Sequence, residues 1–595
     1  MNRISLTILS ICLLVFSFFL PVSQVTANEP HGNKVAVGKD GMVATAHPLA
    51  SEVGADVLKK GGNAVDAAVA IQYALNVTEP MMSGIGGGGF MMVYDGKTKE
   101  SSIINSRERA PQGATPDMFL TDDGKVIPFA ERSTHGNAVG VPGTVKGLEA
   151  ALDKWGTRSM KELIKPSIQL AEDGFEIDSV LAKAIDDHQG KLKKTAAAPI
   201  FIPNDQPLKE GDLLVQPRLA KTFKLIAKKG SKAFYEGKVA KALANTVQDF
   251  GGTMTTVDIA RYEVDTDKPI WGDYKGYHLA SMPPPSSGGV FMLQMLKILD
   301  HFNLSQYDPK SFEKYQLLAE TMHHSYADRL AAYAGDPEFV DVPLNGLLDD
   351  LLDYISERAS LIQLDQKNRN PVKEGDAWAY EDEKNPSPIV SQPEDKTIGE
   401  TTRFKNSFFS FIVADQWGNV VSFTTTIEQL FGTGILVPEY GFFLNNELTD
   451  FDARPGGANE VQPNKRPLSS MTPTIIFKDN EPVMTVGSPG GSTIIASVSQ
   501  TILNLLEYEM ELQDAVEEPT IYTNSPTSYG YEVGVPLDVR TKLNDLGHRF
   551  GNSPIDIGNV QALLIDRKAG TFTGVADSSR NGTAVGVNIK VSAQK

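Results

Sequence analysis

The pattern of apolar and polar positions predicts a chain that mixes helices and strands. Apolar side chains recur at helical spacing in Ser51–Lys60 and Ala64–Asn76, with a Gly-Gly-Asn stop and cap between them. Short apolar runs bounded by turn residues predict buried strands at Phe90–Tyr94 and Val420–Ile427. By the same criteria we expect further strands at Ser407–Ala414, Thr474–Phe477 and Val483–Val486, and further helices at Val145–Trp155, Met160–Asp173, Val290–Phe302 and Thr493–Tyr508.

The first residues have the pattern of an export signal. Arg3 supplies a positive charge, Ile4–Leu20 is an apolar run, and Val25–Ala27 is a small-residue cleavage site. A retained membrane anchor is the alternative, since the run is near the minimum that spans a bilayer. Cleavage is favoured because small residues follow at the right distance. We therefore predict a signal peptide over residues 1–27 and a secreted protein, which loses its only cysteine, Cys12, with the signal.

Composition narrows the function classes. The chain has 595 residues, of which 41% are hydrophobic and 22% charged, as in a globular protein of one to several domains. Its formal net charge of −18 disfavours binding to nucleic acid phosphates. A single cysteine excludes a disulfide framework and a cysteine-based zinc site. The stretch Lys373–Glu400 is rich in charged residues and proline, so we expect an exposed, mobile segment there.

Two tempting motifs fail in their context. Gly84–Gly89 fits the dinucleotide-binding pattern, but it follows a predicted helix and opens a predicted strand, the reverse of the required order. We interpret it as a tight backbone bend that missing side chains allow. His323 and His324 are neighbours on a predicted helix and point apart, so the pair does not predict a metal site.

A hydroxyl residue follows the acidic segment directly. Thr401 and Thr402 come after Gly399-Glu400, at a junction where a chain could cut itself. A threonine freed by such a cut holds a nucleophile and a base in one residue, because its α-amino group can take the Oγ proton. The pair alone means little, since threonines at the start of a strand are common. The motifs downstream make the difference.

Several long motifs occur in the order seen in one family. Gly418–Gly432 closely resembles the second half of the gamma-glutamyltranspeptidase (glutathione hydrolase) signature. The other segments that resemble this family are Gly61–Ala68, Arg107–Pro111, Val141–Gly143, Asn445–Phe451, Pro463–Met471 and Gly487–Ser492. Together they span nearly the whole mature chain.

This resemblance implies an N-terminal nucleophile hydrolase: an αββα sandwich, with two stacked antiparallel sheets between helix layers. It also implies a proenzyme that cuts itself into a large subunit, residues 28–400, and a small subunit, residues 401–595. The implied activity is acyl transfer from glutathione and other gamma-glutamyl donors to amino acids, peptides or water. No metal or cofactor is implied.

The resemblance also implies a site for the free α-carboxylate and α-ammonium of a gamma-glutamyl group. Arg107 can bind the carboxylate through two charge-assisted hydrogen bonds, with help from the hydroxyls of Ser469 and Ser470. Three acidic residues can surround the ammonium: Glu428, Glu447 and Asp450. A site that recognises the zwitterion leaves the rest of the donor unrestricted.

The catalytic residues implied are four. Thr401 is the nucleophile, and Thr426 hydrogen-bonds it. Gly490 and Gly491 precede a predicted helix, so their backbone N–H groups can form an oxyanion hole.

One segment departs from the family pattern. The family has histidine where this chain has Arg403, and about seven extra residues follow here before the strand. Counting back from Thr426 without a gap places Phe408, which has no nucleophile, at the catalytic position. If the insertion loops out, Thr401 can reach its place; if the phenylalanines continue the strand, it cannot. Weaker candidates for the nucleophile are Thr402, Ser407 and Ser410.

Three functional interpretations follow. The first is an active transferase and hydrolase. The second is a processing-defective homologue that binds gamma-glutamyl ligands because the insertion displaces its nucleophile. The third, a scaffold without a ligand, conflicts with the retained charged set. The connection from Asp450 to Ser469 also looks shorter than in relatives with a lid loop, which predicts an open cleft that could admit poly-gamma-glutamate.

Overall fold

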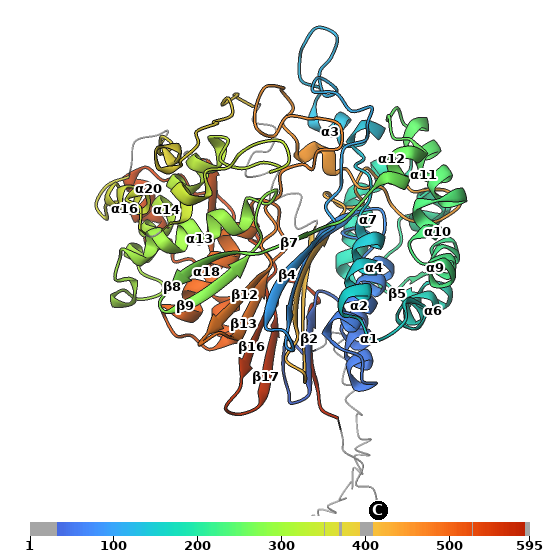
Figure 1. Ribbon diagram of the computed structural model, residues 1–595, viewed down its shortest axis with the longest axis horizontal. Helices are drawn as coiled ribbons and strands as arrows, with labels where there is room; N and C mark the ends of the chain where they lie inside the picture. The colour runs from blue at the N-terminus through green and yellow to red at the C-terminus, as the bar shows by residue number, and fades with distance from the viewer. Residues whose placement is uncertain (1–32, 350, 368–371, 393–407, 526–527, 590–595) are drawn as a thin grey trace, which may run out of the picture.

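The computed structural model describes residues 33–349, 351–367, 372–392, 408–525 and 528–589. Two seven-stranded sheets, antiparallel throughout, lie face to face at its centre (Figure 1). We name them after two of their inner strands, β10 and β13. In order, the β10 sheet contains β18 (Thr583–Val587), β2 (Gly41–Thr45), β10 (Phe408–Asp415), β11 (Val420–Thr426), β3 (Gly88–Asp95), β4 (Glu100–Asn105) and β7 (Asp265–Asp267). The β13 sheet contains β1 (Val35–Gly38), β17 (Thr571–Ala576), β16 (Gln561–Asp566), β13 (Glu481–Gly487), β12 (Thr474–Lys478), β9 (Tyr277–Ser281) and β8 (Ile270–Tyr274).

Strand β10 is buried on both faces, and its side chains alternate between two cores. Phe409, Phe411 and Val413 pack in the cluster that contains helix α2 (Ala64–Thr78). Phe408 and Ile412 pack in the cluster that contains the facing β13 sheet. This period of two, with apolar residues at every position but Ser410 and the terminal Asp415, is why the run forms a central strand.

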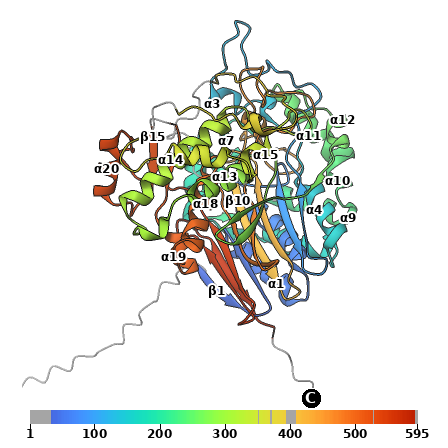
Figure 2. The same ribbon diagram turned by 60° about the vertical axis from the view of Figure 1, so that its left-hand side comes forward.

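Helices cover both outer faces. On the β10 side lie α1 (Pro48–Lys59), α2 and α4 (Thr144–Trp155), and on the β13 side lie α13 (Gly288–Asp300), α14 (Phe312–Leu330) and α18 (Thr493–Leu506). Figure 2, turned so that the α13 side comes forward, shows α13, α14 and α18 in front of the strands. The αββα sandwich is therefore confirmed. The other α-helices and strands of the described residues are α3 (Phe129–Arg132), α5 (Met160–Leu163), α6 (Lys165–Asp173), α7 (Ser179–Leu192), α8 (Ala198–Phe201), α9 (Pro217–Lys229), α10 (Lys232–Tyr235), α11 (Gly237–Asp249), α12 (Thr256–Arg261), α15 (Leu344–Leu348), α16 (Tyr354–Ser360), α19 (Leu512–Glu517), α20 (Leu537–Leu546), β5 (Phe175–Glu176), β6 (Leu213–Leu214), β14 (Ile521–Ser525) and β15 (Ser528–Tyr531).

Most predicted elements are present with small shifts. Helix α1 begins at Pro48, earlier than predicted, because the His47 side chain accepts a hydrogen bond from the N–H of Leu49 and proline suits the first turn. The predicted helix Met160–Asp173 is divided into α5 and α6, and Pro166 lies in the first turn of the second. No helix among the described residues has the length and apolar character to cross a membrane.

The acidic segment differs in part from its prediction. Ala377–Tyr380 forms a short 3-10 helix in which Ala377 is fully buried and Trp378 is only 7% exposed. The expectation of an exposed stretch is wrong there, because one tryptophan can anchor a polar segment to a core. Its neighbours Glu374 and Glu383 are exposed, as expected. Residues 393–400 lie outside the described part of the chain.

Candidate active site

The register of β10 and β11 decides which residue faces Thr426. Phe408 pairs with Thr426 across the two strands, and Thr426 pairs with Gly88 on its other side. A phenyl ring therefore lies opposite Thr426. That this is the nucleophile position, as the count without a gap places it, stays a prediction. Thr401, Thr402 and Ser407 lie outside the described residues. Ser410, the remaining candidate, is buried within the sheet opposite Thr424.

The predicted oxyanion-hole glycines adjoin this position. Gly490 has φ +139° and Gly491 has φ +59°, in the left-handed region that favours glycine. A Cβ built on Gly491 would lie 3.8 Å from Cε2 of Phe408. The Gly490 carbonyl accepts hydrogen bonds from the N–H and the Oγ1 of Thr493, at 3.2 and 2.8 Å, which hold the turn against the start of α18. Among the described residues neither glycine N–H has a hydrogen-bond partner, so both are available to an oxyanion.

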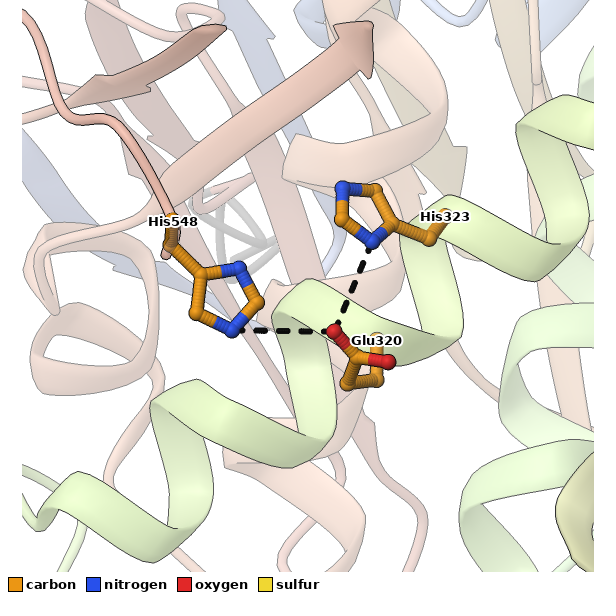
Figure 3. Close-up of side chains that lie close together, drawn as sticks. All are labelled: Glu320, His323 and His548. Atoms are coloured by element: carbon orange, nitrogen blue, oxygen red, sulfur yellow. Dashed lines mark ion pairs between the residues drawn. The ribbon is translucent and has the colours of Figure 1, made fainter. Parts of the chain in front are cut away.

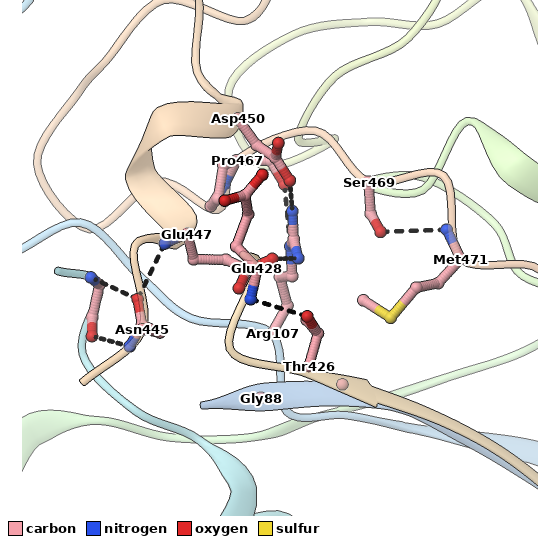
Figure 4. Close-up of polar contacts among 12 residues, drawn as sticks. Gly88, Arg107, Thr426, Glu428, Asn445, Glu447, Asp450, Pro467, Ser469 and Met471 are labelled. Atoms are coloured by element: carbon pink, nitrogen blue, oxygen red, sulfur yellow. Dashed lines mark hydrogen bonds and ion pairs between the residues drawn. The ribbon is translucent and has the colours of Figure 1, made fainter. Parts of the chain in front are cut away.

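Arg107 lies at the centre of a buried charged cluster (Figure 4). Its Nη1 contacts Glu447 Oε1, and its Nη2 donates to Asp450 Oδ2 at 2.8 Å. Two backbone carbonyls complete the set: that of Leu468 accepts from Nη2 at 2.8 Å and that of Pro467 from Nε at 3.3 Å. Burial alone would lower the pKa of Arg107, but the two carboxylates outweigh it and raise the pKa, so the guanidinium stays charged.

The position of Glu447 is fixed by the segment that precedes it. Asn445 Oδ1 accepts from the N–H groups of Glu447 and Gly140, at 3.0 and 2.9 Å. The Asn445 amide nitrogen donates to the carbonyls of Gly86 and Gly140 at 2.7 and 2.8 Å. One side chain thereby ties the acidic turn to the glycine-rich bend. A Cβ on Gly86 or Gly87 would collide with a backbone carbonyl, which supports the interpretation of that run as a close approach of backbones.

Glu428 is held in an uncommon backbone conformation. Its φ is +74°, and its N–H donates to Thr426 Oγ1 at 2.7 Å (Figure 4). A non-glycine residue with positive φ costs about 1–3 kcal/mol and marks a site whose surroundings impose the conformation. This hydrogen bond fixes the orientation of the Thr426 hydroxyl at the end of β11, where the chain turns away from the sheet at Glu428.

The two predicted serines lie near the cluster but bind other partners. Ser469 Oγ accepts from the N–H of Met471 at 3.2 Å, and Ser470 Oγ accepts from Arg329 Nη2 at 3.1 Å. Arg329, in the last turn of α14, also donates to Ser287 Oγ at 2.8 Å. Sequence analysis missed Arg329, because nothing local connects it with a serine so far along the chain.

Comparison with known proteins agrees with this geometry. The family model described as gamma-glutamyltranspeptidase matches residues 50–587. The chain belongs to the gamma-glutamyltranspeptidase family. It is 72% identical over 557 residues to the glutathione hydrolase proenzyme of Bacillus subtilis (strain 168), covering 94% of this chain and 93% of that protein. The glutathione hydrolase proenzyme of Escherichia coli (strain K12) is 38% identical, with 89% and 88% covered.

Solved structures support the same fold. Cephalosporin acylase from Bacillus halodurans has a TM-score of 0.80 at 26% identity, covering 96% of this chain and all of that one. Helicobacter pylori gamma-glutamyltranspeptidase has a TM-score of 0.55 at 39% identity, covering 57% of this chain and 97% of that one. This chain is thus an enzyme-family member whose β10 strand carries phenylalanine opposite Thr426.

Glu108 is a further site residue that sequence analysis quoted in a motif but gave no role. It is fully buried, and neither carboxyl oxygen has a hydrogen-bond partner among the described residues. Burial raises its pKa to about 8, against the opposing effect of Arg107. A Cβ on Gly88 would lie 2.6 Å from its Oε2, so this carboxyl group lies directly behind the strand that pairs with Thr426.

Proposed function

We propose that this chain transfers gamma-glutamyl groups from glutathione and related donors to amino acids, peptides or water. The observation that carries the proposal is the buried Arg107–Glu447–Asp450 cluster beside Thr426 and the two glycines. It offers one cation and two anions, the complement of the α-carboxylate and α-ammonium of a gamma-glutamyl donor. The name of the Bacillus subtilis relative, glutathione hydrolase proenzyme, supports the same substrate class.

A donor can bind in this cluster while every buried charge keeps an ion-pair partner. Without a ligand, Arg107 is neutralised by Glu447 and Asp450. When the zwitterion binds, its α-carboxylate pairs with the Arg107 guanidinium. Its α-ammonium pairs with the carboxylates of Glu447 and Asp450, near Glu428. Each internal ion pair is exchanged for one with the ligand. A truncated ligand that lacks either charge leaves a buried group unpaired, which costs several kcal/mol and gives strong selectivity.

The proposed chemistry is a two-step acyl transfer. Thr401 Oγ attacks the γ-carbonyl as its own α-amino group takes the proton, and the carbonyl oxygen becomes an oxyanion bound by the N–H groups of Gly490 and Gly491. The C–N bond breaks and the amine leaves with a proton. Water or an acceptor amine then attacks the glutamyl-threonine ester and releases the enzyme. The proposal requires residues 401–407 to bring Thr401 beside Gly491, next to the Phe408 ring.

The register at Phe408 favours a second candidate, a homologue that binds gamma-glutamyl ligands without being processed. The phenyl ring carries no nucleophile, and it adjoins Gly491. In that case the charged cluster would bind ligand and no acyl-enzyme would form.

Product analysis separates the two candidates. Purified protein is incubated with glutathione, with and without glycylglycine, and the products are measured by mass spectrometry. The first candidate predicts glutamate, cysteinylglycine and, with the acceptor, a gamma-glutamyl tripeptide. The second predicts saturable binding of glutathione by calorimetry and no product. Arg107→Met should abolish binding, whereas Arg567→Met, at an exposed position, should leave it unchanged.

We further propose that residues 1–27 direct export and that residues 28–400 and 401–595 remain together as two subunits. The contacts of Arg107 with Glu447 and Asp450 join the two parts and support their association. The short connection from Asp450 to Ser469 supports an open cleft for poly-gamma-glutamate. Release of glutamate from that polymer is the expected result, and its absence alongside glutathione cleavage would refute the polymer substrate.

A further inference from the structure

The guanidinium of Arg329 joins two hydroxyl groups at the edge of the active site. Arg329 belongs to the last turn of α14; its Nε donates to Ser287 Oγ at 2.8 Å and its Nη2 donates to Ser470 Oγ at 3.1 Å. Among the residues that the structure describes, no carboxylate forms an ion pair with this guanidinium. Arginine is charged throughout the physiological pH range, so this side chain brings a positive charge to the Ser470 hydroxyl.

Asp452 is an acid that responds to this charge without pairing with it. Burial raises the pKa of Asp452 to about 6, and Asn459, Lys465 and Arg329 oppose that effect, in decreasing order. Arg329 is therefore a minor partner of Asp452. The hydrogen bonds of its guanidinium go to the two serine hydroxyls.

The proline-rich loop of residues 283–287 holds the backbone of Ser469. The N–H and the Oγ of Ser287 both donate to the Ser469 carbonyl, at 2.8 and 2.7 Å. Because the Ser287 hydroxyl donates its one proton there, its oxygen can accept from Arg329. Arg329 thus reaches Ser470 directly and Ser469 through Ser287.

The hydroxyl groups of Ser469 and Ser470 accept hydrogen bonds and keep their protons for another acceptor. Ser469 Oγ accepts from the N–H of Met471 at 3.2 Å, and Ser470 Oγ accepts from Arg329. Neither hydroxyl donates to an acceptor in the described part of the chain, although the two residues are only 3% and 8% exposed. Buried hydroxyl groups normally donate as well as accept, so this pair is set to donate to a ligand.

The same turn starts beside the guanidinium of Arg107. The carbonyl of Leu468, the residue before Ser469, accepts from Arg107 Nη2 at 2.8 Å. Figure 4 shows Ser469 and Glu447 on opposite sides of Arg107. A carboxylate held by Arg107 has lone pairs to spare for two hydroxyl donors.

Charge balance explains why a second cation is useful here. The Arg107 cluster contains two acidic side chains, Glu447 and Asp450, against one guanidinium. A donor carboxylate in this cluster is therefore attracted by one cation and faces two acids. A guanidinium behind Ser470 adds attraction on the carboxylate side, and a hydroxyl that accepts from a cation is itself a stronger donor.

We propose that Arg329 is a positioning residue for the donor. It turns the hydroxyl groups of Ser469 and Ser470 toward the α-carboxylate of a gamma-glutamyl donor and adds a second positive charge to that side of the site. The inference rests on the proposed function for the identity of the ligand. Arg329 acts through the two serines and does not touch the reacting carbonyl.

Binding of glutathione to the full-length protein tests the proposal. Isothermal titration calorimetry compares the unmodified protein with Arg329→Met, which removes the charge and both hydrogen bonds. We expect the Kd to rise about 10–100-fold, the loss typical of hydrogen bonds that involve a charged group. Arg261→Met, which replaces an exposed arginine in the last turn of α12, is the matched control and should leave the Kd unchanged. A Kd of Arg329→Met within about twofold of the unmodified protein would overturn the proposal.

Two further variants separate positioning from a general structural role. Arg329→Lys keeps the charge and can donate to one serine, so it should bind glutathione more tightly than Arg329→Met; equal Kd values would overturn the role of the cation. In a Ser470→Ala background, Arg329→Met should weaken binding at least about threefold less than it does alone, because the hydroxyl through which it acts is gone. Equal losses in both backgrounds would refute the route through Ser470. If Arg329→Met does not fold, Arg329→Gln takes its place in both comparisons.

Kinetics separates this inference from the proposed function. The hydrogen bonds of Arg329 go to serines and not to the oxyanion glycines, so glutathione cleavage by Arg329→Met should show a raised KM with kcat within about threefold. A lower kcat at an unchanged KM would overturn the proposal. Binding of glutathione without cleavage by the unmodified protein would refute the transfer activity, and the Kd comparison would still decide the role of Arg329. An unmodified protein that does not bind glutathione would refute both.

Discussion

Replacing Glu108 by glutamine should change how the stability of this protein depends on pH. The Glu108 carboxyl group is fully buried behind β3, and burial raises its pKa from 4.5 to about 8. Between these values the folded protein keeps a proton that the unfolded chain releases. The free energy of unfolding therefore falls as pH rises, by about 1.4 kcal/mol per pH unit from this group, or roughly 5 kcal/mol across the window.

The Glu108→Gln variant has no such proton. Its buried amide adds an offset that does not depend on pH, so the test is the slope and not the stability at one pH. Urea unfolding followed by tryptophan fluorescence, from about pH 5 to about pH 8, should show the variant gaining several kcal/mol on the unmodified protein as pH rises. Glu100→Gln, at the exposed end of β4, is the control and should leave the difference flat. Parallel curves for Glu108→Gln and the unmodified protein would refute a protonated Glu108.

Three further substitutions address the site. Arg107→Met leaves Glu447 and Asp450 without their cation and should lower the free energy of unfolding, measured in urea, by about 3–5 kcal/mol. A change below about 1 kcal/mol would mean that the ion pairs contribute little. Gly490→Ala places a side chain at φ +139°, a backbone conformation that favours glycine, and should therefore displace the oxyanion donors. The rate of glutathione cleavage should fall about 100-fold or more, and an unaltered rate would contradict the role of these N–H groups. Phe408→Thr introduces a hydroxyl opposite Thr426. If Thr401 is the nucleophile, N-terminal sequencing of the smaller fragment should still give Thr401. A cut before position 408 would instead show that the place opposite Thr426 determines the cleavage site.

Local signals explain why the central strands could be predicted. β10 and β11 consist of continuous buried residues joined by a turn, and the Asp415 carboxylate accepts from the N–H groups of Trp417 and Asn419, at 2.9 and 3.0 Å. The residues that determine this hairpin all lie within the segment 408–426. The motif residues of the site could likewise be proposed, because they fall in family order. The structure brings Arg107, Glu447 and Asp450 into direct contact.

Other features depend on partners far apart in the sequence. Arg107 was expected to be open to a ligand, but the structure pairs it with the acids expected to bind the ammonium, since a buried guanidinium must be neutralised when no ligand is present. His323 was considered only with its neighbour His324. In the structure its ring lies 5.3 Å from that of Tyr529 and 5.8 Å from that of His548 (Figure 3), centre to centre. Both residues belong to the last part of the chain, and no periodicity connects them with His323. The burial of Trp378 within a polar segment escaped prediction for the same reason.

The proposed mechanism depends on self-cleavage before Thr401, which frees the hydroxyl that attacks the donor. The most direct measurement is the intact mass of the purified protein together with the N-terminal sequence of its smaller fragment. We expect two associated fragments, the smaller beginning with Thr401-Thr402-Arg403. A single uncut chain that binds glutathione, or a fragment that begins at another residue, would contradict it.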